Sequence, residues 1–357
     1  MALHTDGPRI LVMGCGGIGG TIAAHLTELG ADVHIVSRNP RTAEVVRSNG
    51  IRLVGEAGRR TVPCRIHGAV PNGPFHYVLF ATQPTDVEAA AREALPQLAP
   101  GGHAVTFQNG LCETRVADIL GDPTRVIGGI VAWGASMIEP GVVDKTSAGG
   151  FVLGGLAGGD AKAVDVLEGL LCAVGPVQRT DNLLGARWSK LALNCVVSTL
   201  GTLNGSTLGK VVKMRHARRL ALEIITEVVA VAQAAEVRLE KVSGTLDLEW
   251  IALTEAERAQ GSMALAAKHA MLLAVGLRYR RLRSSMLRAI EAGKPPAIDF
   301  LNGEVVRHGR RHEVSVPLNS LVCDRVWAMS RGEVLAGPSL VGQIFDETRR
   351  SLGVVAR

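Results

Sequence analysis

Residues 9–19 read RILVMGCGGIG and decide the fold. The first five residues are a short apolar run typical of a buried parallel strand. The pattern G-x-G-x-x-G follows, and residues 18–29 then show helical periodicity up to Gly30. Residues 32–37 read as a second strand, which completes a βαβ unit. A glycine loop in this position predicts a dinucleotide-binding fold.

Each glycine of the loop has a separate task in such a fold. Gly14 permits the tight turn, Gly16 lets a pyrophosphate approach the backbone, and Gly19 lets the helix pack on the strand. The free N–H groups at the helix N-terminus then face the phosphates. We therefore predict that Gly14, Gly16, Gly17, Ile18 and Gly19 bind the cofactor. The alternative is a tight turn without a ligand.

The alternation of strands and helices continues as far as residue 131. It predicts a mostly parallel sheet with helices on both faces. An antiparallel hairpin extension is expected at 134–154, where glycines and Pro140-Gly141 separate short apolar runs. The expected strands are 77–81, 103–107 and 126–131, and the expected helices are 87–95 and 114–120.

Strand patterns end near Asp181, and helical patterns cover 183–200, 214–236, 255–292 and 317–331. The predicted fold class is α/β, with an N-terminal Rossmann-like parallel sheet and an all-helical C-terminal domain. The predicted domains are 1–180, which binds NADP, and 181–357, which binds substrate. The long C-terminal helices could also form a homodimer interface.

Composition excludes several classes of protein. The 357 residues are 47% hydrophobic and 20% charged, which is ordinary for a globular protein and excludes wholesale disorder. Only 3% are aromatic, too few for the stacking platforms of a single-strand nucleic-acid binder. The excess of 39 Lys and Arg over 33 Asp and Glu is mild. The arginines of residues 278–283 are more typical of a solvated helix face than of nucleic-acid contact.

The six cysteines are scattered, with no C-x-x-C pair, so the sequence predicts buried free thiols and neither a metal site nor a disulfide framework. Met1 to Pro8 shows no leader pattern, and no window reaches about 18 uncharged apolar residues. We expect a cytoplasmic protein with no membrane partner.

The end of the second strand selects the nicotinamide cofactor. An NAD site would carry Asp or Glu there for the ribose 2′-OH, whereas this chain has Val36-Ser37-Arg38-Asn39. Arg38 suits a bidentate grip on a 2′-phosphate, and Ser37 can add a hydrogen bond. NADP(H) is therefore the predicted cofactor. The alternative for Arg38 is a solvent-exposed loop arginine.

Two further groups of polar residues are candidate site residues. Asn109, in Gln108-Asn109-Gly110, follows a predicted strand at its carboxyl end, where ligands bind in such folds, and the alternative is an Asn-Gly turn. Lys190, Asn194 and Ser198 are spaced i, i+4, i+8 and share one helix face. A lysine on an apolar helix either faces a partner or extends its ammonium to solvent.

Taken together, these residues resemble the ketopantoate reductase family (2-dehydropantoate 2-reductases and their relatives). The resemblance runs in family order from residue 9 to about 320. It is carried by the 14–19 loop, Arg38, residues 108–110, Gly141-Val142-Val143 before Gly154, Trp188-Ser189-Lys190 with Asn194, Ser284-Ser285-Met286-Leu287, residues 298–303, and Val316-Pro317-Leu318-Asn319.

The resemblance implies NADPH-dependent reduction of a 2-oxo acid to a 2-hydroxy acid in a cleft between the two domains. Lys190 would be the general acid, and Asn109 and Asn194 would orient substrate and cofactor. Ser285 would bind the substrate carboxylate. Ser198 stands where the family has a second Asn, and we include it among the substrate contacts.

Several positions depart from the family pattern. Ala297 replaces a Glu, Leu208 replaces a polar residue, and Gln83 stands where a Lys usually follows the strand, still within reach of the cofactor. These changes imply a less polar pocket. A related NADP-dependent dehydrogenase or imine reductase is therefore an alternative function. A non-catalytic NADP(H) sensor is a further one, but it would need no proton donor.

Overall fold

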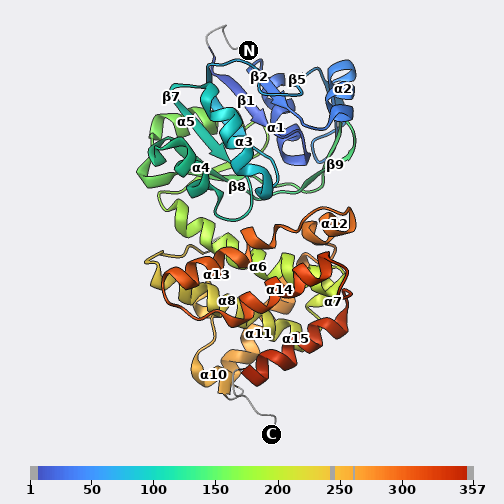
Figure 1. Ribbon diagram of the computed structural model, residues 1–357, viewed down its shortest axis with the longest axis vertical. Helices are drawn as coiled ribbons and strands as arrows, with labels where there is room; N and C mark the ends of the chain where they lie inside the picture. Colours follow the sequence, from blue (N-terminus) through green and yellow to red (C-terminus); the bar gives the residue numbers. More distant parts are fainter. Residues whose placement is uncertain (1–6, 242–245, 260–261, 352–357) are drawn as a thin grey trace. The chain divides into compact units, whose positions relative to one another are not determined.

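The computed structural model describes residues 7–241, 246–259 and 262–351. The chain forms two compact units, Met1–Leu183 and Leu184–Arg357 (Figure 1). The sequence predicts a boundary after residue 180. The predicted fold class is confirmed, because the first unit is built on a mostly parallel sheet and the second is helical.

An eight-stranded sheet forms the centre of the first unit. Its order is β12-β11-β8-β7-β6-β1-β2-β5, and all neighbours are parallel except β8 and β11. The strands are β1 (Arg9–Met13), β2 (Asp32–Val36), β5 (Arg65–His67), β6 (Phe75–Phe80), β7 (Leu98–Thr106), β8 (Val126–Val131), β11 (Phe151–Gly155) and β12 (Val177–Arg179).

Helices cover both faces of this sheet, as predicted. Helices α1 (Gly17–Glu28) and α5 (Ala161–Leu171) pack with Ile10 and Val12 of β1 in one apolar core. Helices α3 (Val87–Ala94) and α4 (Cys112–Leu120) contact β6, β7 and β8. The run at 9–13 lacks polar alternation because both faces of β1 are buried.

A second, four-stranded sheet packs against α1. Its order is β4 (Arg60–Val62), β3 (Ile51–Gly55), β10 (Val142–Lys145) and β9 (Ala135–Glu139). The predicted hairpin is present as β9 and β10, but 134–154 is not one extension, because β11 joins the large sheet. The sequence did not predict three of the strands, β3, β4 and β5. It also did not predict helix α2 (Pro40–Asn49), which is rich in charged residues.

The second unit contains helices throughout its described length. They are α6 (Leu183–Asn204), α7 (Leu208–Val211), α8 (Arg215–Ala234), α9 (Leu248–Ile251), α10 (Glu255–Ala259), α11 (Met263–Arg278), α12 (Ser285–Glu291), α13 (Asn302–Arg311), α14 (Pro317–Ser330) and α15 (Pro338–Ser351). None of the described helices is both long and apolar enough to cross a membrane.

The helical pattern predicted over 255–292 is divided into separate helices. The described part of that segment forms α10, α11 and α12, and residues 260–261 lie outside it. Ser262 and Ser284 cap the last two helices by accepting from the amides of Leu265 and Leu287. The arginines of 278–283 are all exposed, as predicted, but only Arg278 lies in a helix, so they do not form one helix face.

The cysteine expectation needs one correction. All six cysteines are free, but Cys172 is exposed, and Cys64 and Cys323 are only half-buried. Residues 1–6, which contributed to the expectation of no leader, lie outside the described residues.

A chain of buried polar side chains connects four helices of the second unit. The Thr199 hydroxyl on α6 donates to Asn302 Oδ1 on α13 over 2.6 Å. Asn302 Nδ2 donates to Asn319 Oδ1 on α14 over 2.8 Å, and Asn319 Nδ2 donates to Glu227 Oε2 on α8 over 2.7 Å. Because buried polar groups are costly when unpaired, this chain specifies how the helices pack.

We predict that Asn319→Ala destabilises the helical unit by about 1–3 kcal/mol, because Asn302 Nδ2 loses an acceptor and the buried Glu227 carboxylate loses its side-chain donor, keeping only the backbone amides of residues 318 and 319. Urea unfolding followed by circular dichroism measures the loss. Ser315→Ala changes an exposed residue and serves as the matched control. Equal midpoints for the two variants would show that the polar chain contributes nothing to stability.

Candidate active site

Four adjacent parallel strands, β2, β1, β6 and β7, lead into predicted cofactor residues. Backbone pairing continues one residue beyond their carboxyl ends. Gly14 N donates to Val36 O over 3.0 Å, Ala81 N to Met13 O over 2.9 Å, and Phe107 N to Phe80 O over 3.0 Å. The loops that carry the 14–19 motif, Arg38, Gln83 and Asn109 therefore begin from one ordered edge, the usual ligand-binding edge of this fold.

The loop after β1 brings a helix N-terminus to that edge. Gly14 has a φ of +104°, a conformation that favours glycine. A Cβ on Gly19 would lie 2.0 Å from the Gly14 carbonyl oxygen, whereas a Cβ on Gly16 would meet nothing within 4 Å. Gly16 is also the N-cap of α1 and has no side chain to pair with the first N–H groups. These features suit a pyrophosphate above Gly16.

Gly17 and Ile18 are also in the loop. A Cβ on Gly17 would lie 2.4 Å from the carbonyl carbon of Ala135 in β9. Glycine at this position is therefore needed for packing against the second sheet, whatever its contact with a cofactor. Ile18 is half-buried at the start of α1.

The loop after β2 carries one cation and no carboxylate over residues 37–39. The exposed Arg38 guanidinium lies 2.9 Å from Glu93 Oε1 on α3. An exposed ion pair of this kind contributes only about 0–1 kcal/mol, so a phosphate can compete for Arg38. Ser37 is buried, and its hydroxyl oxygen accepts from the Asn39 amide over 3.3 Å. Asn39 in turn caps α2.

The loops after β6 and β7 contain a contact that the sequence did not predict. Gln83 and Asn109 are exposed, whereas Gln108 is buried and donates from Nε2 to Thr82 Oγ1 over 3.2 Å. This hydrogen bond joins the two loops that carry Gln83 and Asn109. The sequence signal that could have indicated this contact is the amide side chain of Gln108 directly after a buried strand.

In the second unit, α6 has one mixed face and one buried face. Lys190, Asn194 and Ser198 are half-buried on the same face, as their spacing predicts. Leu191, Cys195 and other apolar residues on the far side are buried. Asn194 Nδ2 is buried and has no hydrogen-bond partner among the residues that the structure describes. A buried unpaired donor is costly, so this amide is suited to a ligand oxygen.

Ser284 connects the predicted carboxylate-binding residue to α6. Its hydroxyl donates to the Ser198 carbonyl over 2.9 Å and lies 2.8 Å from the Thr202 hydroxyl. Ser285 follows as the exposed first residue of α12. The structure therefore brings Ser285 close to the Ser198 end of the polar face.

Two of the departures from the family pattern occupy different environments. Leu208 is buried in the helical core, where it lines an apolar space with Val196 and Leu200. Ala297 is half-buried at the start of the 3-10 turn Ala297–Phe300. Within the described parts of the chain, no three His, Cys, Asp or Glu side chains are grouped as metal ligands.

The ordered carboxyl edge, the glycine turn and the helix N-terminus define a Rossmann-type dinucleotide-binding fold. Two family models match the chain: Ketopantoate reductase PanE/ApbA over residues 10–158, and Ketopantoate reductase PanE/ApbA C terminal over residues 182–330. The chain therefore belongs to the ketopantoate reductase family, and the predicted resemblance is confirmed.

Individual proteins are similar to this chain in sequence or in fold. The 2-dehydropantoate 2-reductase of Pyrococcus horikoshii is 23% identical over 334 residues, which are 93% of this chain and 99% of the relative. The crystal structure of 2-dehydropantoate 2-reductase from Geobacter metallireducens is 25% identical with a TM-score of 0.73, covering 94% of this chain and 99% of that one. A ternary structure of D-mandelate dehydrogenase with NADH and anilino(oxo)acetate has a TM-score of 0.77 at 17% identity, covering 91% and 99%.

The different surroundings of Gly16 and Gly19 lead to a prediction. Gly19→Ala should lower the melting temperature, because its Cβ collides with the Gly14 carbonyl. Gly16→Ala should leave the melting temperature almost unchanged, because its Cβ would meet no other protein atom. It should weaken cofactor binding, because the Cβ would occupy the space in which the pyrophosphate approaches the backbone. Thermal unfolding and cofactor fluorescence titration measure the two effects. Unchanged cofactor affinity in Gly16→Ala would show that the pyrophosphate does not bind at this loop.

Proposed function

We propose that the protein reduces a 2-oxo acid to a 2-hydroxy acid with NADPH, using Lys190 as the general acid. Family membership supports an oxidoreductase that acts on an oxo acid. The observation that carries the finer proposal is the polar face of α6. A lysine and an unpaired buried amide nitrogen one turn apart on the same face of α6 match the needs of a carbonyl that gains negative charge.

The residues of the chain have distinct tasks in this reaction. Bound NADPH supplies the hydride for the carbonyl carbon. Lys190 stabilises the charge that grows on the carbonyl oxygen and gives that oxygen a proton. Asn194 donates its amide hydrogen to a substrate oxygen and fixes the orientation, with Asn109 orienting the nicotinamide end. Ser285 and Ser198 contribute hydrogen bonds to the substrate.

We also propose NADPH rather than NADH as the reductant. The support is Arg38 at the end of β2, in a loop with no carboxylate to receive a ribose 2′-OH. The weak exposed pair with Glu93 holds the guanidinium in the loop without saturating its five donors.

The natural substrate, in this proposal, is less polar than ketopantoate. Ala297 lacks the carboxylate expected from the family pattern, and Gln83 lacks the charge of the lysine expected there. Leu208 is buried in the helical core and therefore does not bear on the substrate. D-mandelate dehydrogenase has the same fold, and its structure with anilino(oxo)acetate suggests aromatic 2-oxo acids as test substrates. Oxidation of a secondary alcohol or reduction of an imine uses the same groups and is the alternative that substrate profiling tests.

Replacing the proposed acid tests the mechanism. Lys190→Ala should lower kcat by about two orders of magnitude, the usual effect of losing a general acid, with little change in NADPH affinity. NADPH oxidation at 340 nm against ketopantoate and larger apolar 2-oxo acids measures turnover. Lys210→Ala, which alters an exposed lysine of α7, is the control.

The possible results separate the candidate functions. Wild-type turnover by Lys190→Ala would contradict the role of the lysine. NADPH binding by the unaltered protein without turnover of any oxo acid, alcohol or imine would favour a sensor. Rapid turnover of ketopantoate alone would contradict the less polar substrate.

Replacing Arg38 tests the cofactor choice. Arg38→Asp should weaken NADPH binding about 10- to 100-fold, because a charge-assisted bidentate contact becomes repulsion. NADH affinity should change little. Arg92→Asp, an exposed change on α3, controls for the altered net charge. Equal weakening of both cofactors in Arg38→Asp would show that Arg38 does not bind a 2′-phosphate.

A further inference from the structure

The helical unit contains a basic pocket that the proposed reaction does not use. Its volume is about 400 Å³, within the usual range for small-molecule sites. None of Lys190, Asn194, Ser198 or Ser285 lines it. The polar lining includes Arg215, Arg219, Arg258, Arg349, His216 and His269, and apolar lining comes from Leu220, Leu265 and Phe345.

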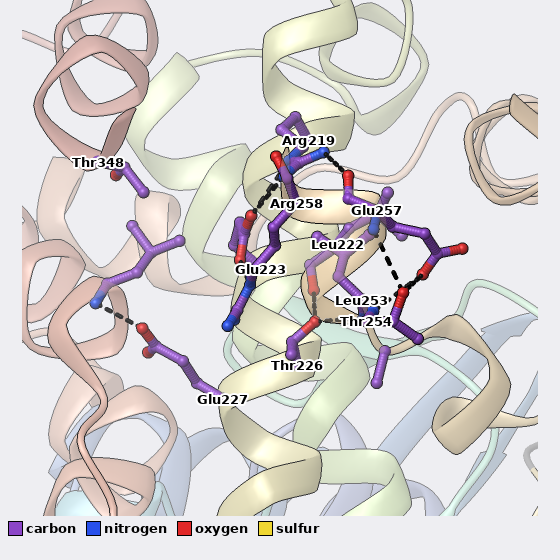
Figure 2. A network of polar contacts seen from close by, with 12 residues as sticks. Arg219, Leu222, Glu223, Thr226, Glu227, Leu253, Thr254, Glu257, Arg258 and Thr348 are labelled. Atoms are coloured by element: carbon purple, nitrogen blue, oxygen red, sulfur yellow. Dashed lines mark hydrogen bonds and ion pairs between the residues drawn. The ribbon is translucent and has the colours of Figure 1, made fainter. Parts of the chain in front are cut away.

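The lining of the pocket has a strong positive excess. Glu223 is the one carboxylate among the described lining residues, against four guanidinium groups, which leaves a formal charge of +3. Its side chain is 4% exposed and lies 2.9 Å from Arg219 Nη2 and 3.0 Å from Arg258 Nε (Figure 2). The carboxylate therefore holds these two arginines in place, and Arg215 and Arg349 are not balanced by it.

The start of α8 adds to the positive potential. The helix begins at Arg215, its N-cap Met214 provides no side-chain acceptor, and its first turn has no acidic residue. Helix N-termini favour anions, yet this one begins Arg-His-Ala-Arg-Arg. The Arg218 guanidinium has a structural role, because it donates to the backbone carbonyls of Val212 and Lys213. The exposed Arg215 side chain makes no hydrogen bond or ion pair with the residues that the structure describes, and the His216 ring lies 6.0 Å from the centre of the Phe345 ring.

The two histidines of the pocket each present an unused nitrogen. His216 Nε2 and His269 Nδ1 are buried and have no hydrogen-bond partner within the described residues. Burial, together with the guanidinium groups of Arg218, Arg215 and Arg219, lowers the pKa of His269 to about 4. A neutral imidazole beside several guanidinium groups indicates that the pocket is short of negative charge.

We propose that this pocket binds a phosphate monoester. The phosphate group would lie against Arg215 and Arg349 with the unused histidine nitrogens as further donors, and the organic part would lie against Leu220, Leu265 and Phe345. A dianion matches the excess of positive charge, and guanidinium groups match its oxygen geometry. The Arg349 guanidinium already lies 5.8 Å from the centre of the Phe345 ring, so the charged and apolar parts adjoin.

Calorimetric titration of the full chain with phenyl phosphate tests the proposal. Saturating NADPH is present throughout, in a buffer free of phosphate, so that the glycine loop is not available to the probe. We expect phenyl phosphate to bind more tightly than inorganic phosphate or benzoate. The double variant Arg215→Gln with Arg349→Gln should lose about tenfold or more in affinity, and its NADPH oxidation should stay unchanged.

The control is the double variant Lys213→Gln with Arg350→Gln, which removes two exposed cations next to the pocket residues without changing the lining. It should bind phenyl phosphate like the unaltered protein. Equal losses in the two double variants would reduce the effect to net charge and overturn the site. No binding at millimolar phenyl phosphate, or tighter binding of benzoate, would overturn the assignment to a phosphate monoester.

Discussion

The close approach of α1 to the end of β1 is the contact on which the first unit depends. Only 2.0 Å would separate a Cβ on Gly19 from the Gly14 carbonyl oxygen, so the helix reaches the strand only because residue 19 is glycine. That approach places the N-terminus of α1 at the sheet edge. It also orients the opposite side of α1, where Gly17 admits the backbone of β9 and the second sheet packs. Two missing side chains, at Gly19 and Gly17, therefore allow both the position of the α1 N-terminus at the sheet edge and the packing of the second sheet.

The helical unit depends instead on polar groups buried in its core. Thr199, Asn302, Asn319 and Glu227 form a continuous series of hydrogen bonds through α6, α13, α14 and α8. Apolar packing alone tolerates sliding and rotation of helices, whereas each of these bonds is directional. The polar chain thus sets the rotation of α6 about its axis, and with it the direction of the face that carries Lys190 and Asn194.

The basic pocket follows a different principle from the rest of the core. Elsewhere in the unit, as at Glu257 and Lys268, a buried charge is matched by an opposite one at 2.6 Å. In the basic pocket, the Glu223 carboxylate pairs with Arg219 and Arg258 only, and the buried nitrogens His216 Nε2 and His269 Nδ1 have no hydrogen-bond partner among the described residues. This contrast within one unit is why an external anion is the simplest completion of the site.

Much of the fold was readable from the sequence, since periodicity and glycine chemistry are local. Residues 9–37 predicted the βαβ unit, the parallel sheet followed from the alternation after it, and the spacing of Lys190, Asn194 and Ser198 placed them on one face. Local patterns failed where structure depends on distant partners. The short charged strands β3 and β4 exist because β10 supplies their sheet, and the break before α12 depends on the Ser284 contacts with α6.

The same distinction applies to the sites. The glycine loop and the lack of a carboxylate beside Arg38 can be read directly from the sequence, because each involves residues adjacent along the chain. Three contacts appear only in the folded chain: Gln108 joins two loops, Asn319 links Asn302 to Glu227, and four arginines line one pocket with a single glutamate. These contacts join residues from separate helices or loops, and the physical reason is that burial and charge balance depend on the folded surroundings of each group.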